Sequence, residues 1–119
     1  SQRLVRKVCL HCKEGYTVEK DIAKNLKINL SIAGNAEFFR GKGCARCFNS
    51  GYSGRTAIVE ILMLSSKIRE LILDKSQEHI IKLQARKEGR RTLREEGIEV
   101  ALKGLTSLEE VLRVTAPDE

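Results

Sequence analysis

The chain has 119 residues, of which 41% are hydrophobic and only 4% aromatic, so it can bury a modest core in one or two small domains. Its formal net charge of +6 lies in the first half: residues 1–60 hold 11 Lys or Arg against 5 Asp or Glu, and residues 61–119 hold 11 against 11. No signal peptide and no long apolar span is visible, which disfavours a secreted disulfide scaffold and a membrane-spanning segment.

Short elements are predicted before and between two cysteine pairs. Residues 3–8 form a basic and apolar segment that leads into the first pair. Residues 19–28 are predicted to form a short helix, because their apolar side chains recur at three- and four-residue steps. Residues 36–40 are predicted to form a strand that returns the chain to the second pair.

The four cysteines of the chain form two Cys-x-x-Cys pairs with 31 residues between them. Each such turn points two thiolates at one spot, and two turns supply the four sulfur ligands of a closed tetrahedral zinc site. A closed site has no open position for catalysis, so the metal is predicted to be structural. The predicted ligands are Cys9, Cys12, Cys44 and Cys47.

Three other interpretations of these cysteines were weighed against zinc. A disulfide framework would suit a secreted chain, a thioredoxin-like redox motif needs one pair in a strand-helix-strand setting, and unligated core cysteines would not normally come in matched pairs. The spacing favours zinc over all three. His11 lies inside the first pair, but it is predicted to face solvent because four cysteines already complete the tetrahedron.

After the second pair, residues 56–64 are nearly continuously apolar and rich in β-branched side chains. This composition predicts a strand that is covered on both faces. Glu60 interrupts the run, and a buried carboxylate needs a basic partner, for which Arg3, Arg6 and Arg55 are the candidates.

The remaining 55 residues are predicted to form four helices. Ser66 and Ser76 are predicted to cap the first two, and Thr92 and Ser107 begin capping-box patterns that open the last two. The apolar stripes of these helices indicate core packing rather than a binding site. The predicted fold class is therefore α+β, with a small four-cysteine zinc-knuckle subdomain of short strands followed by a four-helix C-terminal tail.

Motifs for catalysis are missing from the chain. It has no G-x-x-x-x-G-K-[ST] phosphate loop, no Ser-His-Asp or Cys-His arrangement, and only two histidines, which are far apart. The chain by itself is therefore predicted not to be an enzyme. Its basic half invites a nucleic-acid interpretation, but the few aromatic residues form no basic-aromatic stripe, so a solvated charged face is favoured.

Several motifs follow one another in a characteristic order. They are Cys9-x-x-Cys12, Gly41-Lys42-Gly43-Cys44, Gly51-Tyr52-x-Gly54-Arg55, Thr92-Leu93-Arg94-Glu95 and Thr106-Ser107-Leu108-Glu109-Glu110. In combination, over essentially the whole chain, they resemble the C-terminal end of the type II secretion and type IV pilus assembly ATPases, the hexameric P-loop motors of bacterial envelopes. This resemblance implies a tetracysteine zinc subdomain with a flanking strand at 1–55. It implies a strand that rejoins the ATPase core, and a C-terminal helical subdomain, at 56–119.

The resemblance also implies a cellular setting. Such a protein is cytoplasmic and peripheral at the inner-membrane face, and its partners are neighbouring ATPase subunits and the cytoplasmic domains of the membrane platform. The family's nucleotide-binding residues would lie upstream of Ser1, so ATP and Mg²⁺ belong to the parent protein and the chain is expected to be a fragment. Two hypotheses follow: a zinc-bearing structural and docking module of such an ATPase, or a free-standing zinc module that binds nucleic acid.

Overall fold

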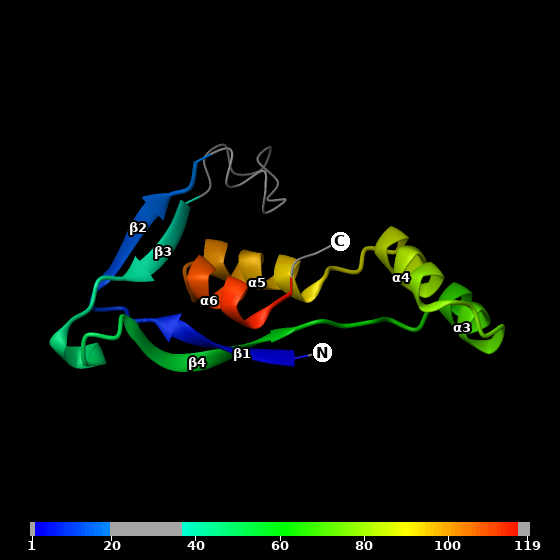
Figure 1. The fold of residues 1–119 in the computed structure, drawn as a ribbon, viewed down its shortest axis with the longest axis horizontal. Coiled ribbons are helices and arrows are strands. Elements are labelled where there is room, and N and C mark those ends of the chain that lie inside the picture. Colours follow the sequence, from blue (N-terminus) through cyan, green and yellow to red (C-terminus); the bar gives the residue numbers. More distant parts are fainter. Residues whose placement is uncertain (1, 20–36, 117–119) are drawn as a thin grey trace.

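The computed structural model describes residues 2–19 and 37–116. Two small sheets and two helix pairs follow one another along an elongated body (Figure 1). The first sheet and the second helix pair lie in the middle, with the cysteine-bearing turns at one end and the first helix pair at the other. The fold is α+β, as the sequence predicts.

Both sheets are antiparallel and have two strands each. β1 (Gln2–Val8) pairs with β4 (Tyr52–Val59), and β2 (Lys13–Thr17) pairs with β3 (Glu37–Gly41). The β1–β4 register shifts near its cysteine-proximal end, where a bulge or irregularity separates two stretches of pairing. The predicted return strand at 36–40 corresponds to β3.

The second helix pair covers one face of the β1–β4 sheet. α5 (Leu93–Leu102) packs on β4, α6 (Leu108–Val114) packs on β1, and both also touch β3 (Figure 1). Alternation along the strands turns one set of side chains toward the helices. The buried apolar cluster at this interface consists of Val5, Val18, Phe38, Ile58, Ile98, Ala101, Leu108 and Val111.

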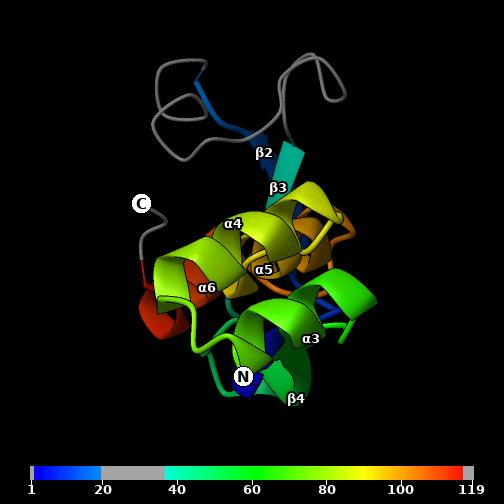
Figure 2. The ribbon, with the colours of Figure 1, turned by 90° about the vertical axis from the view of Figure 1, so that its right-hand side faces the viewer.

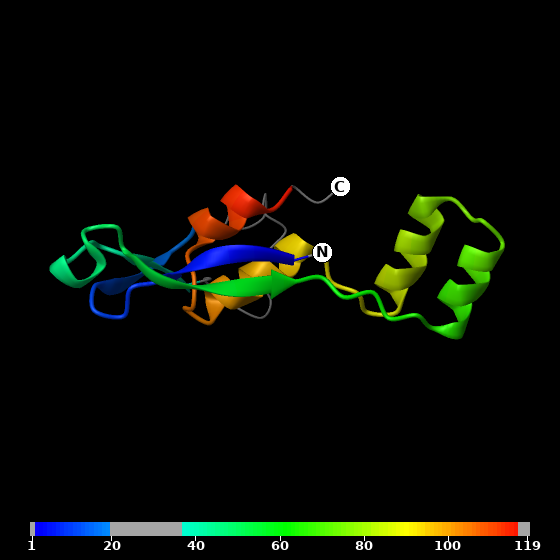
Figure 3. The same ribbon diagram turned by 90° about the horizontal axis from the view of Figure 1, so that it is seen from below.

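The first helix pair stands apart from this core. α3 (Ser66–Leu73) and α4 (Glu78–Lys87) pack against each other (Figure 2) and extend away from the sheets (Figure 3). The chain enters the pair after Glu60 and leaves it at Arg90. Glu60 Oε2 lies 3.0 Å from Arg90 Nη2, so an ion pair joins the entry to the exit.

The predicted caps are confirmed for the second helix pair and shifted for the first. Thr92 and Glu95 form the expected capping box of α5. At α6 the Ser107 hydroxyl accepts the Glu110 amide, but the box is not completed, because the Glu110 carboxylate binds Arg6 and Arg113. Ser65 rather than Ser66 caps α3, where it accepts the Ile68 amide. For α4 the predicted cap Ser76 was also wrong. Gln77 holds that position, without a side-chain hydrogen bond.

Two further expectations about the middle of the chain were wrong. The strand predicted at 56–64 begins earlier and ends at Val59, and the four apolar residues at 61–64 are exposed rather than covered on both faces. These are Ile61 (64%), Leu62 (44%), Met63 (76%) and Leu64 (54%). Glu60 pairs with Arg90, because the chain returns from the helix pair beside it, and it also accepts the Leu93 amide at 3.0 Å. Arg6, one predicted partner, instead contacts Glu110.

Residues 20–28 of the helix predicted at 19–28 lie outside the described residues. Among the helices that the structure does describe, none is both long enough and apolar enough to cross a lipid bilayer.

Candidate metal centre

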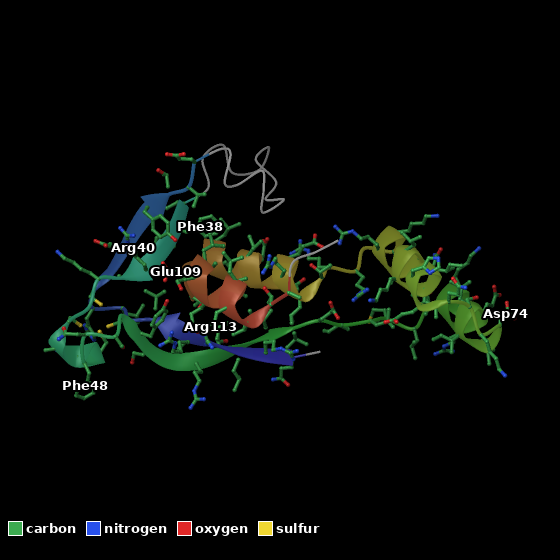
Figure 4. All side chains as sticks on the ribbon, in the orientation of Figure 1. Phe38, Arg40, Phe48, Asp74, Glu109 and Arg113 are labelled. Atoms are coloured by element: carbon green, nitrogen blue, oxygen red, sulfur yellow. The ribbon has the colours of Figure 1, made fainter. Side chains whose placement is uncertain are left out.

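Two turns of the backbone, one for each cysteine pair, bring the four cysteines together at one end of the molecule. Cys9 follows β1 and Cys12 precedes β2, so the first pair lies in the connection between the two sheets. Cys44 precedes η1 (Ala45–Cys47), a single 3-10 turn that ends at the fourth cysteine. Figure 4 shows the sulfur atoms gathered at this end, opposite the helix pair that carries Asp74.

The four sulfur atoms are spaced as a tetrahedral metal requires. All of them lie within 4.8 Å of one another. The Sγ–Sγ distance is 3.8 Å for Cys9 and Cys44, 3.8 Å for Cys12 and Cys47, and 3.6 Å for Cys44 and Cys47. A zinc ion with bonds of about 2.3 Å to four sulfurs places those sulfurs about 3.8 Å apart. The donor set and its geometry therefore fit a four-coordinate thiolate site.

Backbone amides are directed at two of the sulfurs. The Gly43 amide donates to Cys12 Sγ at 3.3 Å, and Cys47 Sγ accepts from the Cys44 amide at 3.3 Å and from the Gly51 amide at 3.2 Å. Donors of this kind stabilise negative charge on sulfur. A Cβ at Gly41 would overlap the backbone of Gly51, so the close approach of these two segments requires glycine.

The environment shifts the pKa values of two of the thiols, Cys12 and Cys47, in opposite directions. Burial raises the pKa of Cys12, and hydrogen bonds with the neighbouring thiols raise it further against the Gly43 amide. Burial also opposes ionisation of Cys47, but the Cys44 and Gly51 amides outweigh it and bring the pKa of Cys47 to about 6. The amide donors therefore favour ionisation of Cys47 over that of Cys12, and a bound divalent cation would displace protons from the cluster.

The other interpretations of the cysteines fare less well against this geometry. All four thiols are free, and the sulfur separations are far longer than the roughly 2.05 Å of a disulfide. The pairs lie in turns between strands, not in a strand-helix-strand setting. His11 is exposed, as predicted, and its Nε2 lies 3.2 Å from Arg46 Nη1 of the opposite knuckle.

Hydrogen bonds connect the cysteine end to the turn between α5 and α6. The Val8 amide donates to the Leu105 carbonyl at 3.0 Å. The Tyr52 hydroxyl lies 2.6 Å from the Ser107 hydroxyl. Sequence reasoning missed this connection, because it joins residues more than 50 positions apart and carries no local pattern.

A buried carboxylate adds a second tie between β1 and α6. Glu110 accepts hydrogen bonds from the Arg6 amide at 2.9 Å, from the Arg6 guanidinium at 2.7 Å and from Arg113 at 2.9 and 3.0 Å. Burial raises the pKa of Glu110, but the bonds from Arg113 and Arg6 prevail and hold it at about 2. The Arg6 guanidinium also stacks over the Tyr52 ring, 4.3 Å from its centroid.

The sequence profile of the family described as "Type II/IV secretion system protein" matches residues 1–113. The chain belongs to this family. The resemblance seen in the sequence motifs is thereby confirmed, and the four-cysteine cluster lies within the matched residues.

Individual relatives in the type II/IV secretion family cover nearly all of the chain. It is 43% identical to the type IV pilus assembly ATPase PilB of Thermus thermophilus over 97% of its length, and 37% identical to PilB of Pseudomonas aeruginosa over 97%. It is also 37% identical to the type II secretion system protein E of Klebsiella pneumoniae over 97%. The chain spans only 13%, 20% and 22% of these three relatives, respectively.

Proposed function

We propose that the chain is the zinc-binding and C-terminal helical part of a hexameric ATPase that powers type II secretion or type IV pilus assembly, and that it serves that motor as a structural and docking module. The observation that carries this proposal is a tetrahedrally spaced cysteine cluster within a chain of the type II/IV secretion family. Relatives named as pilus assembly ATPases and as type II secretion proteins support both branches of the proposal.

The proposed metal is one structural zinc ion held by Cys9, Cys12, Cys44 and Cys47. Sulfur spacing, free thiols and amide donors all suit a closed thiolate site, which takes no part in bond making or breaking. When bound, the ion cross-links the β1–β2 connection to the η1 turn. Zinc binding in such small modules supplies much of their folding free energy.

The proposed division of the chain places the zinc subdomain at 1–55 and the strand and helices that rejoin the ATPase core at 56–119. Supporting this division, the four apolar residues from Ile61 to Leu64, shortly after β4, have exposed side chains that soluble proteins normally cover. Thr56 itself lies inside β4, opposite Val5 of β1, so the β1–β4 sheet holds residues from both sides of the proposed division.

The proposed setting is the cytoplasmic face of the inner membrane. There the partners would be neighbouring ATPase subunits and the cytoplasmic domains of the membrane platform. ATP and Mg²⁺ would bind to the parent motor and not to this chain, whose sequence offers no phosphate-binding loop. The isolated chain is expected not to hydrolyse ATP. Turnover that persists through purification, and that disappears when a residue of this chain is changed, would contradict this assignment.

Metal analysis of the purified protein tests the central claim. Protein prepared without chelator should hold one zinc ion per chain by elemental analysis, and Cys44→Ser should reduce that content while the exposed Ser53→Ala leaves it unchanged. A stoichiometry near zero in the unaltered protein, or a disulfide between any two of these cysteines, would contradict the zinc site.

The alternative function is nucleic-acid binding by a free-standing zinc module, which the basic charge of residues 1–60 favours. Both functions would weaken with salt, so salt dependence cannot separate them. Charge reversal at Lys42 and Arg46 can separate the two functions, when binding is measured to platform domains and to duplex DNA. Loss of DNA binding with unchanged platform binding would favour the alternative.

A further inference from the structure

We infer that the tip of the two cysteine knuckles, formed by Leu10 and Phe48 with Arg46 and Lys42 beside them, is a contact surface for an acidic segment of a partner protein that also offers apolar side chains. This inference rests on the docking role proposed above, and it names the residues that make the contact and the chemistry of what they contact.

Two large apolar side chains are fully presented to solvent at this tip. Phe48 is 93% exposed and Leu10 is 82% exposed, the two highest values among the exposed large hydrophobic residues of the described chain. Phe48 projects from the end of the molecule opposite the α3–α4 helix pair (Figure 4). Neither side chain supports the fold by packing, so their apolar character needs another explanation.

The backbone conformation of Phe48 disfavours an aromatic residue at this position. Its φ of 55° and ψ of 38° lie in the left-handed region, which glycine and asparagine adopt far more readily than an aromatic residue. Asn49, with a φ of 61°, follows the usual preference. A phenylalanine at position 48 therefore carries a conformational cost as well as an exposed ring.

The two knuckles form one surface because the cysteine cluster joins them. Cys9 directly precedes Leu10, and Cys44 lies two residues before Arg46. The sulfur atoms of these two cysteines are 3.8 Å apart. Across the same gap, His11 Nε2 lies 3.2 Å from Arg46 Nη1. A metal-pinned pair of turns loses little conformational entropy on binding, so a contact made there retains more of its interaction free energy.

Charge at the tip selects an acidic partner. Residues 8–13 and 41–51 contain Lys13, Lys42 and Arg46 and no Asp or Glu. A zinc ion with four thiolates carries −2, so these residues together would keep a net charge of +1, with the exposed cations Lys42 and Arg46 at the surface. Carboxylates on the partner would complement these cations.

Magnitudes favour a protein over a lipid surface. A single myristoyl chain, at about 0.8 kcal/mol per buried CH₂, gives only marginal and reversible membrane binding. Leu10 and Phe48 together offer less hydrocarbon than that chain. In a protein pocket, by contrast, one buried aromatic anchor can account for a tenfold or larger change in affinity.

The test measures binding of the intact protein to three probes: purified cytoplasmic domains of the membrane platform, vesicles of phosphatidylglycerol and phosphatidylcholine, and duplex DNA. Phe48→Asn removes the ring at a backbone conformation that asparagine accepts, so the fold is expected to be at least as stable. Leu10→Ser removes the second apolar group. Leu73→Ser, at a side chain that is 81% exposed on α3, is the matched control.

We expect binding to an acidic platform domain to weaken at least about tenfold in Phe48→Asn and in Leu10→Ser, with no change in Leu73→Ser. Unchanged binding in both tip variants, or a loss confined to vesicles or DNA, would overturn the inference. If charge reversal at Lys42 and Arg46 weakens platform binding and the tip variants do not, the docking role stands and this inference fails. If the unaltered protein binds no platform domain, both fail.

Discussion

The two helix pairs of this chain have similar lengths and similar sequence patterns, yet the structure uses them differently. α5 and α6 bury their apolar stripes on the β1–β4 sheet, where Ala101 and Val111 are fully inaccessible to solvent. α3 and α4 bury only Ile68 and Ala85, and leave Leu73 and Leu83 exposed. Amphipathic periodicity therefore identifies a helix without identifying what it packs against.

The two helix pairs also differ in their polar contacts. The α5–α6 pair is tied to the strands and to the cysteine end through Glu110, Ser107 and the Leu105 carbonyl. Within α4, Lys82 Nζ lies 3.4 Å from Glu78 Oε1, and both side chains are exposed. Such a surface ion pair contributes little to the free energy of unfolding. The cysteine cluster, the sheet and α5–α6 thus form one connected unit. The α3–α4 pair joins this unit through two ion pairs, Arg90 with Glu60 and Arg86 of α4 with Glu95 of α5.

Loss of the metal should give the largest effect and should divide the chain along this line. Cys44→Ser is expected to destabilise the knuckles by several kcal/mol, because zinc binding is worth about 10–16 kcal/mol in small zinc modules. Hydrogen exchange should show faster exchange at 37–51 and at the α5–α6 turn around Leu105, with α3–α4 unaffected. Equal loss of protection in all four helices would contradict the division.

The next largest difference between the two helix pairs is expected in the free energy of unfolding that is lost when an isoleucine is truncated. Ile98→Ala in α5, at a side chain that is 7% exposed, is expected to lower the free energy of unfolding by about 2–4 kcal/mol. Ile72→Ala in α3 removes the same atoms from a side chain that is 46% exposed, and should cost less than about 1 kcal/mol. Urea unfolding of both variants tests this, and similar costs would show that α3 is buried in solution.

Acid should weaken the connected unit through Glu110. Because its folded pKa of about 2 lies below the ordinary value of 4.5, its contribution is present above about pH 4.5 and is lost as the pH falls toward 2. That contribution is roughly 3 kcal/mol at most. Glu110→Gln should therefore lower stability at pH 7 and flatten its acid dependence, whereas Glu78→Gln in α4 should change neither. An unchanged acid profile in Glu110→Gln would contradict the assignment.

The smallest effect is expected where a single neutral hydrogen bond links the cysteine end to α6. Tyr52→Phe removes the hydroxyl that lies 2.6 Å from Ser107, at a cost of about 1 kcal/mol. Faster amide exchange should appear at the N-terminus of α6 in the same variant. Ser53→Ala, at the exposed neighbouring position, controls for local sequence change. No shift in the denaturation midpoint of Tyr52→Phe would show that the bond contributes nothing.

Much of the fold follows from local chemistry in the sequence. The cysteine spacing predicted a cluster, and the structure brings all four sulfurs together. Thr92 and Ser107 predicted the starts of α5 and α6, because a cap is a contact between residues three positions apart. The strand predicted at residues 36–40 likewise corresponds to β3.

The errors arise where distant residues decide the outcome. The partner of Glu60 is Arg90, which reaches it only because the chain departs for two helices and returns. The apolar run from Ile61 to Leu64 has strand composition, but within the described residues no neighbouring strand offers it a ladder. The Tyr52–Ser107 contact, likewise, leaves no signal in the sequence around either residue.

The Glu60–Arg90 contact has a consequence for how this region can evolve and be engineered. Because the polypeptide departs and returns beside this contact, changes in the length of the 29 residues between Glu60 and Arg90 are expected to move the strands little. Such changes would remove one further tie, the ion pair of Arg86 with Glu95. Replacing these residues with a short turn would leave the cysteine cluster and its helical cover in place. The α3–α4 pair is thus the part of the described chain whose exchange is expected to disturb the cysteine cluster least.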